Sequence, residues 1–359
     1  MVKGSDKKYY DAVMAHWDSL AKPIDGLGDL ERIVAQIGSI RQTDTPCIDH
    51  RTLLLFLSDN GIVAENVSQS ESSVTHNVAE AMSRRESTVC VMAEKAGVDL
   101  LPVDIGMIGD PVPGITYRRI REGTRDFAVE PAMTMDETKK AIDIGREMAA
   151  LAIDGGVSKV GCDVLLLGEM GIGNTSTATA VSCALLGLSP FDMAGHGAGL
   201  SERLIEHKKK ILSDALKKYD FNPEDAIEVL SIFGGYDIAG MTGAILEAAK
   251  RHVPVILDGL ITLSAALVAA RLATDIDIAS FCIPSHFPRE PMGQHLIHAL
   301  GYEKAPIDAG IALGEGTGAV LLMPLLDVCM HLYYHGQCFE RLSLQPYERY
   351  GEATAKSDT

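Results

Sequence analysis

Short apolar runs alternate along this chain with longer segments whose apolar residues recur at helical spacing. The runs cover 52–57, 99–103, 164–167, 253–257 and 278–283, and each is followed by a polar residue, a glycine or a proline. The segment 204–216 shows the helical spacing. Apolar strands that alternate with helices are typical of a parallel sheet covered on both faces. We therefore predict an α/β fold with a doubly wound parallel sheet.

The two ends of the chain have a helical pattern without strands. One apolar stripe follows a candidate helix N-cap at Asp29 and consists of Leu27, Leu30, Ile33, Val34 and Ile37. We predict that residues 1–40 and 317–350 pack together as a small helical domain, and that residues 41–316 form a large nucleotide-binding domain. The polar residues 351–359 are predicted to be a disordered tail.

Composition narrows the classes of function. The 359 residues are 47% hydrophobic and only 5% aromatic, with 34 glycines, which favours an enzyme with many loops lined by backbone. The net charge of -17 argues against nucleic acid and acidic membranes as partners. Seven scattered cysteines without a Cys-x-x-Cys pair indicate reduced thiols. With no apolar signal segment and no run long enough to span a bilayer, we expect a cytoplasmic protein.

The loop 168–174, GEMGIGN, lies between a predicted strand and a predicted helix. Its glycines let the backbone approach a ligand, and the helix start offers free N–H groups to an anion. Glu169 would repel a phosphate, so we place it on sugar hydroxyls or on a cationic ring; a tight turn with a solvated Glu169 is the alternative. A dinucleotide fingerprint, and hence an NAD-dependent oxidoreductase, is a second alternative, but Ser176 stands where the third glycine belongs.

Two further glycine-rich loops precede predicted helices. The loop 195–199, GHGAG, is followed by a helix with a candidate cap at Ser201 and with Lys208, a combination that suits phosphate. The loop 313–318, LGEGTG, places Glu315 between two glycines and beside apolar segments. Burial would raise the pKa of this carboxyl and make it a usable base near neutral pH. An exposed turn glutamate is the alternative.

Two other groups of residues have side chains that could carry chemistry. Ser285, His286 and Glu290 could form a hydrolase triad, but the Gly-x-Ser-x-Gly elbow is missing and the spacing is too tight. The C-terminal cluster of Cys329, His331, His335 and Cys338 resembles a metal-ligand set. On one straight helix His331 and Cys338 would be about 10 Å apart along the axis, too far for a single ion. A helix break at Gly336 would be needed, so metal binding stays open.

In their order, these loops resemble the nicotinate-nucleotide–dimethylbenzimidazole phosphoribosyltransferases, which make the lower-ligand nucleotide of cobamides. The resemblance runs from about residue 22 to residue 326. It rests on KPIDGLGDLE (22–31), GEMGIGNT (168–175), GHGAG (195–199) with Lys208, GGYDIA (234–239), DG (258–259), SH (285–286) and LGEGTG (313–318).

The resemblance implies transfer of ribose 5-phosphate from nicotinate mononucleotide to a small aromatic acceptor, without a cofactor or a metal. It also implies a homodimer and names Glu315 as the catalytic base. The residues that would line the nucleotide site are Glu169, Gly171, Ile172, Gly173, Asn174, Gly197, Lys208, Ser285, Gly314 and Gly316.

The sequence departs from the family where the acceptor should bind. Asn60 stands where the family usually has a histidine, and Ser72 stands where it usually has a glutamine. We place the acceptor beside Asn60, Ser68 and Ser72. Loss of the glutamine amide suggests an altered acceptor such as a phenol, so the expected acceptor is either dimethylbenzimidazole or a phenol. The phenol-using relatives pair as heterodimers, so a partner subunit with a degenerate site of its own is the alternative function.

Overall fold

A computed structural model describes residues 6–197 and 199–348 of the protein. Two compact units emerge from the contacts within the chain. One unit comprises Ile48–Met323, and the other consists of the described residues up to Cys47 together with those from Pro324 onward. The tail predicted at 351–359 lies outside the described residues.

The larger unit contains a six-stranded parallel sheet. Its strands are β1 (Arg51–Ser58), β2 (Asp99–Gly106), β3 (Thr116–Tyr117), β4 (Val164–Met170), β5 (Val255–Leu257) and β6 (Cys282–Pro284). Its helices are η1 (Gly61–Glu65), α3 (Ser73–Ser83), α4 (Thr88–Ala96), α5 (Met135–Ile153), α6 (Asn174–Leu186), α7 (Pro190–Met193), α8 (Glu202–Lys218), α9 (Ala226–Phe233), α10 (Tyr236–Lys250), α11 (Leu260–Leu272), α12 (Ile278–Phe281), α13 (Pro291–Ala299) and the start of α14 (Thr317–His335).

The strands are ordered β3-β2-β1-β4-β5-β6. The chain order therefore reverses between β1 and β4, and in such sheets ligands bind in the crevice at the carboxyl ends of the strands. The central strand β1 pairs on both sides, with Leu54 opposite Leu101 of β2 and Leu167 of β4. All eight residues of β1 are buried, which explains why its sequence is a nearly unbroken apolar run.

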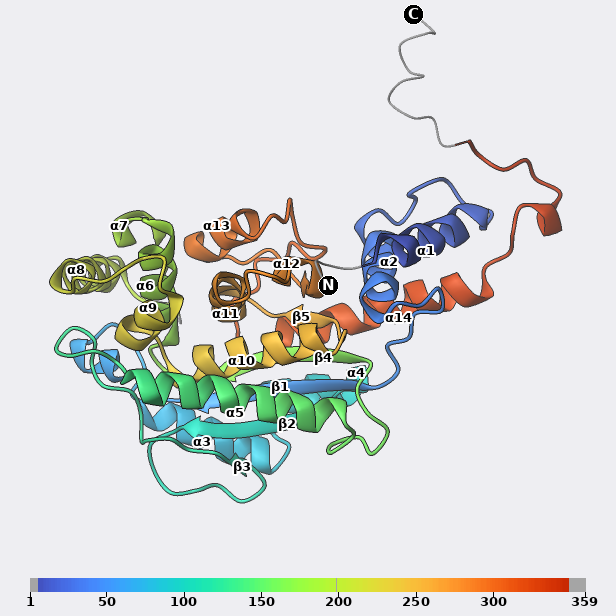
Figure 1. Cartoon of the computed structure of the whole chain (residues 1–359). Helices are drawn as coiled ribbons and strands as arrows, with labels where there is room; N and C mark the ends of the chain where they lie inside the picture. Colours follow the sequence, from blue (N-terminus) through green and yellow to red (C-terminus); the bar gives the residue numbers. More distant parts are fainter. Residues whose placement is uncertain (1–5, 198, 349–359) are drawn as a thin grey trace, which may run out of the picture. The chain divides into compact units, whose positions relative to one another are not determined.

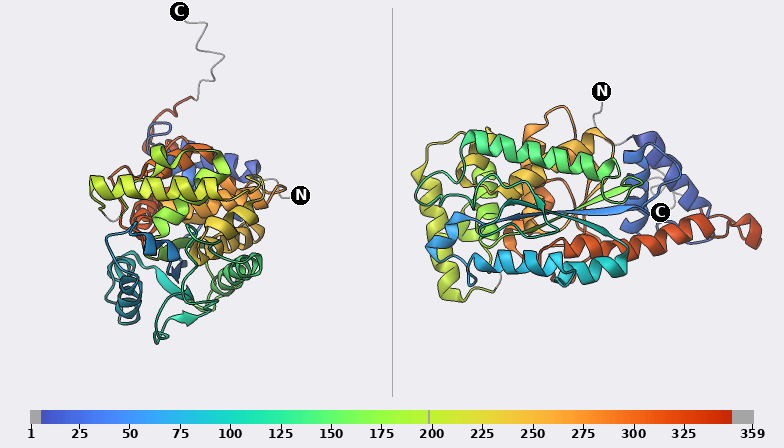
Figure 2. Two further views of the ribbon diagram at one scale, coloured as in Figure 1. Left: turned by 90° about the vertical axis from the view of Figure 1, so that its left-hand side faces the viewer. Right: turned by 90° about the horizontal axis from the view of Figure 1, so that it is seen from below.

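Helices cover both faces of this sheet, as the alternating pattern predicted. Figure 1 shows α5 and α10 side by side along one face, and Figure 2 shows α3 and α4 on the opposite face. The backbones of α5 and α10 touch: a Cβ added to Gly145 would lie 1.8 Å from the carbonyl oxygen of Gly240. A Cβ added to Gly243 would likewise lie 1.9 Å from the carbonyl oxygen of Ile142, so the close approach of these helices requires glycine.

The smaller unit is helical. It contains α1 (Lys7–Ser19), α2 (Asp29–Arg41), the part of α14 from Pro324 onward and η2 (Glu340–Leu342). The imidazole of His16 bonds the carbonyl oxygen of Tyr333 at 2.7 Å, and the rings of Trp17 and Tyr333 meet edge to face. Lys22 and the buried Glu31, from the motif 22–31, form an ion pair of 2.9 Å that closes the loop between α1 and α2.

Two local predictions were wrong. The run 278–283 was predicted as one strand, but it forms the short helix α12 and only then enters β6 at Cys282. Asp29 was predicted as an N-cap, but it is the first residue of α2, and Gly28, with φ of 57°, is the cap. Only a glycine adopts that left-handed conformation at little cost.

One helix, α14, is apolar and long enough to cross a bilayer by length and composition alone. However, 56% of its most apolar window is buried inside the structure, as in the core helix of a globular domain. The seven cysteines, all within the described residues, are free thiols.

Candidate active site

A pocket lies at the carboxyl ends of β4, β5 and β6. Its volume is about 390 Å³. Seven of the residues predicted from the sequence line it: Glu169, Gly171, Ile172, Asn174, Gly197, Gly314 and Glu315. The structure adds several residues that were assigned no role in the predicted site, among them Thr175, Asp258, His286, Arg289 and Glu290.

The loop between β4 and α6 forms one wall of the pocket. Glu169 is the next-to-last residue of β4, and Asn174 is the first residue of α6. The side-chain amide of Asn174 donates to a carboxylate oxygen of Glu169. Gly173, with φ of 92°, caps α6 and lies behind the wall, where its conformation favours glycine. The loop thus presents a carboxylate to the pocket, supported by an amide.

Glu315 forms an adjoining wall, in the turn that precedes α14. Its amide donates to the carbonyl oxygen of Glu169 at 3.2 Å, so the two loops are joined by their backbones. Burial raises the pKa of the Glu315 carboxyl, whereas hydrogen bonds from the Val89 amide and the Ser87 hydroxyl oppose this rise. Its atom Oε2 is buried and has no hydrogen-bond partner among the described residues. A poised, partly desolvated carboxyl of this kind can accept a proton.

Further carboxyl groups surround these two. Burial raises the pKa of Glu169 well above its usual value, and the neighbouring charges of Asp237 and Asp258 raise it further. Asp237 is completely buried at the start of α10, and burial raises its pKa to about 7. Such a concentration of carboxyl groups suits a cationic ring or a sugar that develops positive charge, because a nearby positive charge favours their ionised forms.

Lys208, in α8, is buried behind the pocket lining, next to Thr175 and the loop 195–197. Its Nζ atom donates to the Thr175 hydroxyl at 3.0 Å and to the Gly195 carbonyl at 3.3 Å. Burial lowers the pKa of this lysine to about 8, and the nearby Glu290 partly offsets the effect. Glu290 accepts a hydrogen bond from the Gly197 amide at 3.1 Å. Lysine, hydroxyl and glycine loop together provide donors for an anionic group.

The three predicted acceptor residues, Asn60, Ser68 and Ser72, lie outside the pocket lining. Asn60 is buried beneath the β4–α6 loop, where its side-chain amide donates to the carbonyl oxygen of Ile172 at 3.3 Å. The hydroxyl of Ser68 accepts from the Ser70 amide at 3.2 Å, and Ser72 precedes α3. From this same segment, Ser70 faces the pocket instead.

Four of the predicted nucleotide residues, Gly173, Lys208, Ser285 and Gly316, likewise stand behind the lining. The proposed hydrolase triad is not assembled. The Ser285 hydroxyl lies 3.1 Å from Nδ1 of His286, but Glu290 bonds the loop at Gly197. Within the described ranges, no group of three or more His, Cys, Asp or Glu side chains could hold a metal ion. The rings of His331 and His335 are tilted against each other, with centroids 4.5 Å apart and an interplanar angle of 44°.

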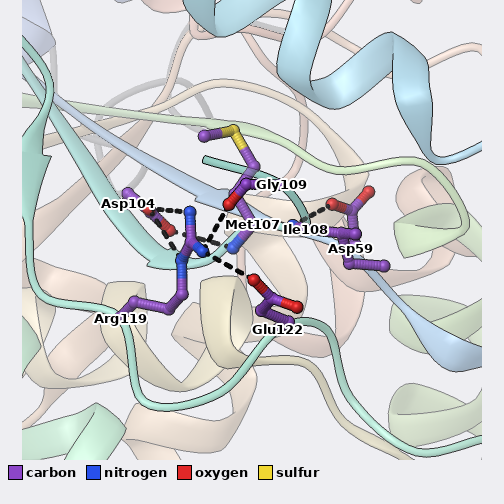
Figure 3. A network of polar contacts seen from close by, with 7 residues as sticks. All are labelled: Asp59, Asp104, Met107, Ile108, Gly109, Arg119 and Glu122. Carbon is purple, nitrogen blue, oxygen red and sulfur yellow. Dashed lines mark hydrogen bonds and ion pairs between the residues drawn. The ribbon is translucent and has the colours of Figure 1, made fainter. Parts of the chain in front are cut away.

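A polar network fixes the loops that follow β1 and β2, close to the strand ends (Figure 3). Asp59 accepts from the Ile108 amide at 2.8 Å, and Asp104 forms a buried ion pair with Arg119 at 2.8 Å. Arg119 also bonds Glu122 at 3.1 Å and the carbonyl oxygen of Gly109 at 2.6 Å. The network holds the loop 107–122 against the sheet.

This fold and its carboxyl-rich pocket belong to a phosphoribosyltransferase: a family model with that description matches residues 2–341. A nicotinate-nucleotide–dimethylbenzimidazole phosphoribosyltransferase from Clostridium acetobutylicum is 36% identical over 348 residues, which cover 97% of each chain. The protein of the same name from Acetivibrio thermocellus is 35% identical over 343 residues, 95% of each chain. The crystal structure of CobT from Thermus thermophilus matches with a TM-score of 0.86 and 31% identity, and covers 95% of this chain and 100% of that one. The chain therefore belongs to the nicotinate-nucleotide–dimethylbenzimidazole phosphoribosyltransferase family, as its motifs indicated.

Proposed function

We propose that this chain transfers ribose 5-phosphate from nicotinate mononucleotide to 5,6-dimethylbenzimidazole, with Glu315 as the base. The observation that carries this proposal is the buried, unpartnered Oε2 atom of Glu315, a residue that lines the same pocket as Glu169. The names of the relatives point to the same donor and acceptor. Because the chain belongs to this transferase family, the alternative of an NAD-dependent oxidoreductase is not favoured.

The reaction needs only one proton acceptor. The unprotonated ring nitrogen of the acceptor attacks the anomeric carbon of the ribose, and the proton on the acceptor's other ring nitrogen passes to the Glu315 carboxylate. The bond from that carbon to the pyridinium nitrogen breaks, and its electron pair neutralises the ring as nicotinate leaves. No general acid is required, because the leaving group is already cationic. Attack opposite the leaving group turns a β-nucleotide into an α-linked product.

The remaining acceleration comes from holding the two reactants in line. We assign Glu169, Asn174 and the glycine loops to the ribose and its cationic ring. Lys208, with Thr175 and Gly197, is assigned to an anionic group of the donor. A flat aromatic acceptor would fit against the apolar side chains that line the pocket, which are those of Val74, Val78, Met170 and Ile172.

A nicotinate-release assay on the purified full chain tests the base assignment. We expect Glu315→Gln to lower kcat by at least about 100-fold while the thermal midpoint stays within a few degrees. The matched control is Glu147→Gln, an exposed glutamate on α5 that pairs with Arg118. Activity of Glu315→Gln within threefold of the wild type would reject Glu315 as the base.

The same assay decides the acceptor. We expect dimethylbenzimidazole to be used at least tenfold more efficiently, by kcat/KM, than phenol. A reversed preference would support the altered acceptor suggested by the departures at positions 60 and 72. The alternative of a partner subunit with a degenerate site predicts no activity for the chain alone. It is not favoured, because Glu169, Asn174 and Glu315 all line one pocket.

A further inference from the structure

Three consecutive residues before α14 have left-handed backbone. The φ angles are 85° at Gly314, 59° at Glu315 and 82° at Gly316. Glycine adopts this region freely, but a residue with a Cβ is strained there and stays in it only where its surroundings hold it. The proposed base therefore has a backbone conformation that its own Cβ disfavours, and contacts from outside the turn must hold it.

Asp258 supplies such contacts. It follows β5 directly, and its side chain is buried. Its Oδ2 atom accepts a hydrogen bond from the Gly316 amide at 3.1 Å, and its Oδ1 atom accepts from the Gly318 amide at 2.7 Å. One of these amides ends the left-handed turn, and the other lies in the first turn of α14. A carboxylate is favoured there because the N–H groups at a helix start have no partners within the helix.

Asp258, with its two bonds to the Gly316 and Gly318 amides, forms a clamp on the turn, and Ser285 and His286 pack closely against it. The Ser285 hydroxyl donates to the backbone carbonyl of Asp258 at 3.2 Å, and Nδ1 of His286 lies 4.0 Å from its Oδ1 atom. A Cβ added to Gly318 would lie 2.1 Å from that imidazole nitrogen and 2.7 Å from the carboxylate. The carboxylate of Asp258 is thus fixed in place, so it can transmit a fixed position to the turn.

We propose that Asp258 is a positioning residue for the transfer. By binding the amides of Gly316 and Gly318, its carboxylate holds the left-handed turn that presents Glu315 to the acceptor. The inference rests on the proposed role of Glu315 as the base. Asp258 also lines the pocket, so a direct contact with substrate is the competing role, and the experiment has to separate the two.

A double-mutant cycle makes this separation, because a residue that acts only through Glu315 has no effect once Glu315 is disabled. Asp258→Asn, Glu315→Gln and the double variant are compared with the wild type by nicotinate release, with long incubations for the slow variants. An asparagine can accept through only one oxygen, so one of the two clamp bonds is lost. We expect Asp258→Asn to lower kcat by about 10- to 100-fold in the wild type, with the KM for the donor changed by less than about threefold. In the Glu315→Gln background the further loss should be less than about twofold.

The matched control is Asp225→Asn. Asp225 is the exposed N-cap of α9 and also accepts from two amides, those of Ile227 and Glu228, at 3.1 and 3.0 Å. Both amides bond the same oxygen, Oδ1, so the control removes a carboxylate charge at a helix start away from the pocket while an asparagine can keep both bonds, and we expect wild-type kcat.

Equal losses in both backgrounds, or wild-type kcat for Asp258→Asn, would overturn the positioning role. Full activity of Glu315→Gln would instead reject the proposed function itself, which is a different result. Should Asp258→Asn fail to fold, Ser285→Ala takes its place in the cycle, because it removes only the hydroxyl that supports Asp258. Its expected loss is about two- to tenfold, and this loss too should disappear in the Glu315→Gln background.

Discussion

The backbone of Gly168, inside β4, lies directly against the backbone of Glu315. A Cβ added to Gly168 would come within 2.8 Å of the carbonyl oxygen of Glu315 and of the amide nitrogen of Gly316. Side chains essentially never approach backbone that closely, so the strand and the turn can meet only because position 168 has no side chain. The two walls of the pocket thus depend on each other, and the following prediction tests this dependence.

Gly168→Ala should displace the turn and lower kcat by about tenfold or more, because small displacements of a catalytic group are costly. The measurement is nicotinate release together with thermal unfolding. Gly187→Ala is the control: its Cβ would meet open space, but its φ of 67° is unfavourable for alanine. We expect that control to lose about 1 kcal/mol of stability and to keep its activity. Normal kcat in Gly168→Ala would show that the contact does not set the position of Glu315.

The pH dependence of kcat should reveal the base. Burial raises the pKa of Glu315 above its ordinary value of 4.5, and the base acts only when it has lost its proton. We therefore expect kcat to fall as the pH falls, with an acid limb centred above pH 4.5. In Glu315→Gln the residual rate should lack this limb. If the limb persists in that variant, it belongs to another group, with Glu169 as the first candidate.

Lys208 should set donor affinity at alkaline pH. Its pKa is lowered to about 8, so its charge is lost as the pH rises through that value, and the KM for nicotinate mononucleotide should rise there. Lys208→Met should raise this KM by about tenfold at pH 7 and remove the alkaline dependence. Lys209→Met, on the same helix and paired with Glu206 at 2.8 Å, should leave the KM unchanged. Equal effects of the two substitutions would indicate only a general loss of positive charge.

Asp237 should make the fold less stable as the pH rises. Its pKa is about 7 in the folded protein against an ordinary 3.8. Between these values the folded protein holds a proton that the unfolded chain has released, so the free energy of unfolding falls with rising pH. Asp237→Asn should remove part of this fall, on the order of a few kcal/mol, when unfolding is compared at pH 5 and pH 8. Asp143→Asn, an exposed aspartate on α5, is the control and should change nothing. An unchanged pH slope in Asp237→Asn would contradict the assignment.

The sheet could be predicted well from the sequence, because a parallel strand that is buried on both faces consists mainly of consecutive apolar residues. β1 begins and ends within one residue of its prediction. Where the run was ambiguous, at 278–283, a short helix could not be told from a strand, and the two-residue β3 carries no pattern at all.

The loops around Glu169 and Glu315, which line the pocket, were predicted because glycines and carboxylates stand together in the sequence there. The residues that contact the acceptor were harder to predict. Comparison with the family's usual glutamine position pointed to Ser72, whereas Ser70 and Val74 line the pocket. A shift of one or two residues along the chain turns a side chain to another direction. The clamp at Asp258 depends on two distant segments meeting, and no spacing within the sequence encodes that meeting.

The crowding of carboxyl groups around the pocket also bears on how the donor binds. Near neutral pH some of these groups hold protons, since burial and mutual repulsion favour the uncharged form. A pyridinium ring brought among them would favour the ionised forms and so expel protons into the solvent. Titration calorimetry in buffers of different ionisation enthalpy should then give different apparent heats for the same association, and the difference would count the protons released.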